Sequence, residues 1–227
     1  MDCSPDLSSL ASVFLEGLAK PQRESILAAG TLRQFRANSV VTNEGHTADH
    51  LFLLAKGRAR FFYITEEGKK LILLWLTPGE LFGGRALLLT PSTYLVSTDT
   101  VKESWIIVWK RSTIRDLAVR YPRLLDNAIL EASDFIASHL GSYVALTSNN
   151  ARQRLVHVLT TLAPRVGREV SDGIELDVTN EELANAANVG LFTVSRLLSE
   201  LHRKGALLKR RGKVLLRSPG QLLSDAA

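Results

Sequence analysis

One stretch, residues 178–203, constrains the possible folds most strongly, because it has the pattern of two short helices joined by a tight turn. Thr179 can cap the first helix, and Glu182 stands three residues later, as in a capping box. Asn188 and Gly190 tolerate the backbone angles of a turn. The second helix has apolar residues at helical spacing, namely Val194, Leu197, Leu198 and Leu201. This pattern fits a helix that enters the DNA major groove, or an ordinary helical hairpin inside another domain.

The charge that follows this stretch favours the first of the two interpretations. Two short apolar runs, residues 206–208 and 214–216, flank a basic turn at residues 209–213, and this arrangement predicts a β-wing. Residues 196–217 contain eight basic residues and one acidic residue, a net charge of +7, whereas the whole chain carries only +5. Positive charge is therefore concentrated beside the second helix, as binding to DNA phosphates requires.

The composition is that of a globular protein. Hydrophobic residues make up 45% and charged residues 22% of the 227 residues, a length that allows one large or two small domains. No apolar run reaches the roughly 18 residues of a membrane helix, and the first ten residues lack the basic start of a secretory signal. The single cysteine, Cys3, excludes an internal disulfide and an all-cysteine metal or iron–sulfur site. We therefore expect a cytoplasmic protein that does not insert into membranes.

The N-terminal half of the chain has the rhythm of β-structure. Residues 7–29 form a helical opening, in which Pro21 fits the first turn of a second short helix. Residues 31–107 then alternate between short apolar runs and glycine turns. Many short strands separated by such turns predict an antiparallel sandwich or barrel.

The longest predicted helix, residues 123–147, carries a seam with heptad spacing. A short helix precedes it, beginning near Ser112 and ending near Pro122. The seam residues are spaced alternately four and three apart and are Leu125, Ile129, Ala132, Ile136, His139, Tyr143 and Leu146. Such a seam favours a coiled-coil partner and hence a dimer, and the alternative is packing against the chain's own β-domain.

Between this helix and the opening motif, the sequence predicts three shorter features. Residues 148–150 form a hinge, or the N-cap of a helix over residues 152–162. Residues 164–168, which begin with a proline, form a loop. Residues 174–178 alternate between apolar and acidic side chains and predict a strand that leads into the helix pair.

This order of elements resembles the CRP/FNR family of bacterial transcription regulators over nearly the whole chain. The most specific matching segments are residues 78–83, with the sequence PGELFG, and residues 179–205. The resemblance implies an α+β fold with an N-terminal antiparallel β-roll, similar to the cyclic-nucleotide-binding jelly roll, a long dimerisation helix and a C-terminal winged helix-turn-helix. The expected domains are residues 1–122, 123–149 and 150–227, respectively.

The resemblance also implies a set of DNA-binding residues. Family members place an arginine at the position of Arg196 to bind a guanine edge, which fits bidentate arginine–guanine chemistry, and contact phosphate at the positions of Thr179 and Gly190. Phe192 departs from the family's base-reading glutamate, so we predict contact with a thymine methyl, or packing into the protein core. The implied DNA-binding residues are Thr179, Gly190, Leu191, Phe192, Thr193, Ser195, Arg196 and Lys213.

The β-roll departs from relatives that bind cyclic nucleotides. Gly84 stands in place of the glutamate that holds the ribose, and residues 86–101 contain no cation for the cyclic phosphate. Cyclic AMP is therefore not supported, and the effector, if there is one, is unknown. The effector-binding candidates by position are Gly83, Gly84, Arg85 and Tyr94. Haem would need an axial ligand, and the histidines considered for that role, none of which has a supporting pattern, are His46, His50 and His139.

The sequence bears on three classes of function. The favoured one is a homodimer that binds a palindromic operator through two helices about 34 Å apart, with residues 164–168 at the position where relatives contact RNA polymerase. The alternative is a small-molecule-binding or protein-interaction module with a degenerate DNA-reading helix, whose binding would be insensitive to salt. An enzyme is not supported, because the sequence shows no nucleophile–base pair, no metal-ligand spacing and no Walker-type loop.

Overall fold

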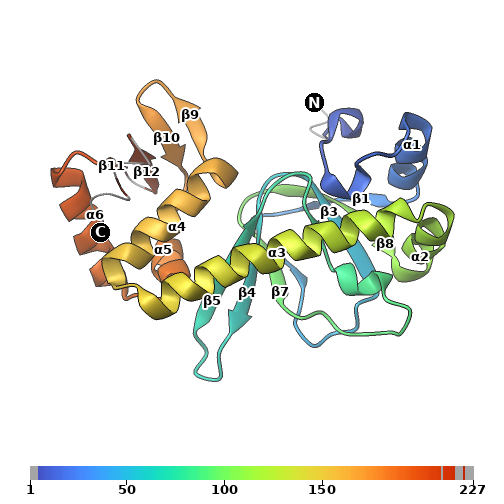
Figure 1. The fold of residues 1–227 in the computed structure, drawn as a ribbon, viewed down its shortest axis with the longest axis horizontal. Helices are drawn as coiled ribbons and strands as arrows, with labels where there is room; N and C mark the ends of the chain where they lie inside the picture. The colour runs from blue at the N-terminus through green and yellow to red at the C-terminus, as the bar shows by residue number, and fades with distance from the viewer. Residues whose placement is uncertain (1–4, 211, 218–221, 223–227) are drawn as a thin grey trace. The chain divides into compact units, whose positions relative to one another are not determined.

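The computed structural model describes residues 5–210, 212–217 and 222 (Figure 1). Cys3 and Arg211, which two of the sequence predictions concern, lie outside the described residues. The chain divides into two compact units, one formed by residues 1–63 and 74–136 and the other by residues 64–73 and 137–227. Each unit is described by itself.

Short helices open the first unit, as the sequence predicts. They are η1 (Leu7–Ser9), η2 (Val13–Leu15) and α1 (Lys20–Ala28). Pro21 lies in the first turn of α1, where its missing N–H group costs no helical hydrogen bond. Phe14, Leu15 and Ile26 are fully buried, so these helices form part of the core of the β-roll.

The strands form two four-stranded antiparallel sheets, which confirms the predicted β-roll. One sheet has the order β1-β8-β3-β6 and consists of β1 (Thr31–Phe35), β8 (Ser104–Lys110), β3 (His50–Lys56) and β6 (Leu81–Phe82). The other has the order β2-β7-β4-β5 and consists of β2 (Val40–Thr42), β7 (Ser97–Thr100), β4 (Ala59–Ile64) and β5 (Lys70–Leu76). Trp109 lies in the core, where its indole N–H donates to the Ile26 carbonyl at 2.8 Å.

The segment after β5 makes the sharp turn expected from its glycines. Gly83 has a φ of +74° and caps η3 (Gly84–Leu87). A Cβ at this position would lie 2.8 Å from the His50 carbonyl oxygen, so a larger residue would displace the neighbouring strand. The glycine is therefore required for close packing of this turn against β3.

The helices α2 (Arg111–Arg120) and α3 (Arg123–Ser148) follow the β-roll at the predicted positions. One side of α3 packs against the roll. The Asn127 amide donates to the carbonyls of Phe14 and Glu16 at 3.0 and 2.9 Å, and the Phe135 ring makes an edge contact with Phe61 at 5.5 Å. Leu124 is fully buried on the same side. The N-terminal half of α3 is therefore an integral part of the first unit.

The second unit contains a three-helix core and a small sheet. Its helices are α4 (Ala151–Val166), α5 (Asn180–Ala187) and α6 (Leu191–Arg203). The sheet has the order β11-β12-β10-β9 and consists of β11 (Leu207–Arg210), β12 (Lys213–Leu216), β10 (Gly173–Leu176) and β9 (Arg168–Val170). The predicted wing is confirmed as the antiparallel pair β11–β12 (Figure 1).

Two details of this unit differ from the sequence predictions. The prediction of a loop at residues 164–168 is wrong, because α4 continues through Pro164 to Val166 and β9 begins at Arg168. Pro164 has no N–H to donate to the Thr160 carbonyl, but the helix continues past it and ends with the Gly167 N–H bonded to the Ala163 carbonyl at 3.1 Å. Strand β9 was not predicted. The N-cap role of Asn150 is confirmed, since its side chain accepts from the Gln153 N–H.

No helix in the described ranges has the length and apolar content needed to cross a membrane.

Candidate nucleic-acid interface

The helix pair has the local geometry that its sequence predicts. Thr179 Oγ1 accepts from the Glu182 N–H at 3.2 Å, and the Glu182 carboxylate accepts from the Thr179 N–H at 2.8 Å. Asn188 ends α5 in the left-handed conformation, with a φ of +48°. Arg154 of α4 donates to the carbonyls of Ala187 and Asn188 at 3.0 and 3.3 Å. The capping box fixes where α5 begins, and Arg154 satisfies carbonyls where α5 ends.

Helix α6 is strongly two-sided. Its buried residues are Val194, Leu197, Leu198 and Leu201. On the other side Phe192 is 91% exposed, Leu191 is about half exposed, and the side chain of Arg196 is 68% exposed. Of the two predictions for Phe192, packing into the protein core is wrong. The first turn of α6 therefore presents two large apolar side chains to solvent, one turn before an arginine.

Arg196 forms an ion pair with Glu200, which also binds a second arginine. Arg196 Nη1 donates to Glu200 Oε1 at 3.2 Å, and Arg152 Nη2 of α4 donates to Glu200 Oε2 at 2.6 Å. Beside them, Lys209 of β11 approaches the Ser195 hydroxyl at 3.4 Å, which brings the wing next to α6. Polar contacts therefore join the centre of α6 both to α4 and to the wing.

The Glu175 carboxylate of β10 binds cations from the wing and from β9. Glu175 Oε1 accepts from Lys213 Nζ at 2.9 Å and from Arg168 Nη2 at 2.7 Å, and Arg210 lies 3.7 Å from Oε2. Lys213 first, and then Arg168, hold the pKa of Glu175 below its usual value. Lys213 was predicted to bind DNA, and its ammonium group is bound by Glu175 in the free protein.

The remaining predicted DNA-binding residues lie at the two helix N-termini. Thr179 is the N-cap of α5 and Gly190 is the N-cap of α6, where backbone N–H groups are available to an anion. Thr193 is half-buried in the first turn of α6. The structure thus brings all eight predicted residues onto α5, α6 and the adjoining wing.

Of the effector candidates in the β-roll, Tyr94 is bound to strand β3. The Tyr94 hydroxyl donates to the His50 carbonyl and accepts from the His50 N–H, both at 3.1 Å, so it braces β3. Burial raises the pKa of this phenol. The rings of Phe52 and Phe82 stack at 4.8 Å, and Phe61 makes an edge contact with Phe82 at 6.4 Å. These ring contacts join β3 and β6 of one sheet to β4 of the other.

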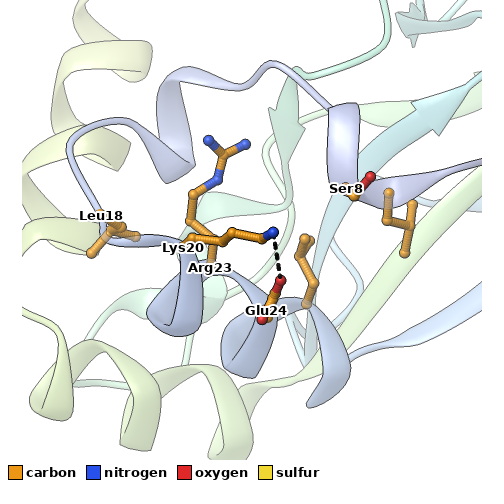
Figure 2. A pocket seen from close by; sticks show the side chains of 7 residues that line it. Ser8, Leu18, Lys20, Arg23 and Glu24 are labelled. Carbon is orange, nitrogen blue, oxygen red and sulfur yellow. Dashed lines mark ion pairs between the residues drawn. The ribbon is translucent and has the colours of Figure 1, made fainter.

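A pocket of about 230 Å³ lies elsewhere in the first unit, beside α1. It is lined by Leu7, Ser8, Leu18, Lys20, Arg23, Glu24 and Leu27 (Figure 2). Lys20 and Glu24, one turn apart on α1, form an exposed ion pair at 4.0 Å (Figure 2). None of the four predicted effector residues lines this pocket.

The sequence predictions missed three carboxylates with specific contacts, namely Glu175, Glu200 and Glu131, which accepts from the Leu81 N–H. Glu200 could have been found, because it stands four residues after Arg196 and is the only acid in residues 196–217. Glu175 and Glu131 owe their surroundings to contacts between distant segments, and the sequence carries no local signal for them.

Two family models match the chain, and together they span most of it. A cyclic nucleotide-binding domain model matches residues 32–121. A Crp-like helix-turn-helix domain model matches residues 153–224. The first match lies on the β-roll and the second contains α5, α6 and the wing.

Individual relatives match this chain over most of their lengths. The chain is 28% identical to the cyclic AMP receptor protein of Thermus thermophilus, with 93% of this chain and 95% of that protein covered. It is 24% identical to the anaerobic regulatory protein of Bacillus subtilis, with coverages of 85% and 82%. The fold is similar to that of CLP, a c-di-GMP responsive global regulator of Xanthomonas campestris, with a TM-score of 0.78, 20% identity, and 88% and 100% of the two chains covered.

The β-roll, the helix pair with its wing, and these matches agree. The chain belongs to the CRP/FNR family of DNA-binding transcription regulators.

Proposed function

We propose that this protein is a homodimeric regulator that binds a palindromic operator by inserting α6 of each protomer into the major groove. The observation that carries the proposal is the two-sided character of α6. Its apolar side is fixed in the core of the second unit, while Arg196, Phe192 and Leu191 are exposed. A rigid helix with an exposed reading face is what direct recognition of base edges requires.

The exposed residues suggest how the operator is read. Arg196 binds the O6 and N7 atoms of a guanine. Phe192 has no hydrogen-bonding group, so it packs against the C5-methyl group of a thymine. The N-termini of α5 at Thr179 and of α6 at Gly190 bind phosphates through backbone N–H groups. Lys213 exchanges part of its interaction with Glu175 for phosphate when DNA arrives.

The dimer is proposed to form along α3. Five of its seam residues, Leu125, Ile129, Ala132, Ile136 and Tyr143, are exposed in the single chain, and His139 is half-buried. The side chain of Leu146 lies outside the described ones. A separate face of α3, with Leu124 and Asn127, packs on the roll. The seam therefore stays available for a second copy, and apolar side chains at heptad spacing gain most by pairing with their equivalents.

We propose no cyclic nucleotide as the effector of this regulator. Tyr94, one of the effector candidates by position, makes two hydrogen bonds with the His50 backbone. A cyclic nucleotide bound as in the family's nucleotide-binding members is not expected, because Gly84 replaces the glutamate that holds the ribose and residues 86–101 contain no cation for the phosphate. Contact with RNA polymerase, proposed by resemblance for residues 164–168, would involve the last turn of α4 and the start of β9.

The direct test is selection of bound sequences from random double-stranded DNA by the full-length protein. The expected result is a palindrome whose half-sites are one helical turn apart and contain a guanine and a thymine. Affinity should fall steeply as salt rises, because bound phosphates release counterions. A selected site without two-fold symmetry, or equal affinity of wild type and Arg196→Ala for that site, would contradict the proposal.

A further inference from the structure

The carboxylate of Glu200 binds one arginine with each of its two oxygens. Oε2 accepts from Arg152 of α4 at 2.6 Å, and Oε1 accepts from Arg196 at 3.2 Å. The Glu200 side chain is 23% exposed, about the same as Arg152, whereas Arg196 reaches out to solvent. The chain Arg152–Glu200–Arg196 therefore runs from the interior of the second unit to its exposed reading face.

The backbone under this chain is fixed. Glu200 lies one turn after Arg196, and Leu197, Leu198 and Leu201 beside them are buried. Arg152 lies in the first turn of α4, directly after the capping box formed by Asn150. Because neither helix can shift freely, the carboxylate has a fixed position, and it restricts the otherwise flexible arginine side chain at its Nη1 atom.

This restriction matters for the chemistry of base reading. A guanidinium group has five N–H donors, and a guanine uses two of them in a planar fork. Glu200 engages Nη1, which leaves the edge formed by Nε and Nη2 for the base. An arginine that is already oriented loses less side-chain entropy when it binds, and it holds its plane in the plane of the target base.

Charge alone would give the opposite expectation for Glu200. It is the only acid in residues 196–217, so a carboxylate there should repel phosphates. Removing it should then strengthen binding to every DNA sequence. Two arginines bound to one carboxylate offset that repulsion, and the fixed geometry gives the residue a role that depends on sequence.

We propose that Glu200 is a positioning residue for specificity: held by Arg152, it orients the Arg196 guanidinium towards a guanine in the operator. This inference rests on the proposed function, since it requires that Arg196 reads a base. It predicts that loss of Glu200 relaxes discrimination at one base pair of each half-site and leaves the others unchanged.

The test uses full-length protein and the selected operator. Affinities are measured for this operator and for copies in which one symmetric base pair at a time is replaced. The pair read by Arg196 is the one whose replacement weakens the wild type and does not weaken Arg196→Ala. At that pair, wild type should discriminate about tenfold or more. Glu200→Gln should lose most of this discrimination and bind unrelated DNA as well as the wild type or better.

Two further variants separate geometry from charge. Glu200→Asp keeps the charge but is one methylene shorter and cannot reach both arginines, so it should lose discrimination like Glu200→Gln. Glu169→Gln removes an exposed carboxylate from β9 of the same unit and should discriminate like the wild type. Retained binding to unrelated DNA shows that each variant is folded.

The outcomes distinguish this inference from the proposed function. In the Arg196→Ala background, Glu200→Gln should have no further effect on discrimination, because a positioning residue acts through the residue it positions. Wild-type discrimination in both Glu200 variants would overturn the inference while leaving base reading by Arg196 intact. Loss of discrimination by Glu200→Gln at pairs that Arg196→Ala still discriminates would also overturn it, because the effect would then not act through Arg196. If Arg196→Ala discriminates like the wild type at every pair, the proposed function itself fails.

Discussion

Glu131 of α3 should make the stability of the β-roll depend on pH. One oxygen of this carboxyl accepts from the Leu81 N–H of β6, and the other is buried without a hydrogen-bond partner among the described residues. Burial raises the pKa of Glu131 from 4.5 to about 7, with further contributions from Glu80 and Asp134, against the lowering effect of the Leu81 hydrogen bond. The neutral acid is therefore the form that the fold prefers.

The magnitude follows from linkage. A carboxyl whose pKa is raised in the folded state costs nothing below its unfolded pKa of 4.5, costs progressively more between pH 4.5 and 7, and costs the full amount above pH 7. One pKa unit corresponds to 1.36 kcal/mol, so above pH 7 the cost in unfolding free energy is about 3 kcal/mol. Glu131→Gln, which cannot ionise, should therefore gain about that much stability relative to wild type between pH 4.5 and pH 8.

The assay can be confined to the β-roll. The three tryptophans, Trp75, Trp105 and Trp109, all lie in its strands, so their fluorescence during urea unfolding reports on this part of the chain. Unfolding curves of wild type and Glu131→Gln are compared at pH 4.5, 6 and 8. Asp126→Asn, an exposed change on the same helix, is the matched control and should follow the wild type. Parallel pH dependence of wild type and Glu131→Gln would refute the reasoning.

Three other predictions follow from named contacts. Ile129→Lys together with Ile136→Lys should convert the dimer into monomers in analytical ultracentrifugation without changing the tryptophan-detected stability of the roll, because both side chains are exposed in the single chain; a dimer that persists would exclude this interface. Phe192→Ala should erase the preference for thymine over uracil in the selected operator, since the two bases differ only in the C5-methyl group; a preference that survives would show that another residue reads the methyl. Glu175 has a pKa lowered mainly by Lys213, so its stabilising contribution should be present above pH 4.5 and be lost as the pH falls further. Glu175→Gln should remove this acid sensitivity from the thermal unfolding of the second unit. If the unfolding temperature of the variant falls below pH 4.5 as much as that of the wild type, Glu175 does not have this role.

The features that the sequence predicted correctly depend on short-range chemistry. The capping box of Thr179 and Glu182, the left-handed Asn188 and the two-sided α6 each depend on residues a few positions apart. The heptad seam of α3 is local in the same sense, although whether it faced the roll or solvent could not be decided from spacing alone. Here the packing of Phe61 against Phe135 settles which side of α3 meets the roll.

The features that escaped prediction depend on contacts between distant segments. Arg152 and Glu200 are 48 positions apart, and Lys213 and Glu175 are 38 apart, so no motif connects them. The continuation of α4 through Pro164 was missed because a proline was expected to end the helix. The hydrogen bonds between the Tyr94 hydroxyl and the His50 backbone, 44 positions apart, likewise become visible only in the fold.

The central claim is that a dimer holds two α6 helices in register and presents Arg196 to base edges in each half-site. Its most direct test is the affinity of the full-length protein for the selected palindrome and for the same palindrome with five base pairs inserted at its centre. The insertion turns one half-site to the opposite face of the DNA, so affinity should fall about 100-fold or more, towards that of a single half-site. Equal affinity for the two DNA molecules would contradict the claim.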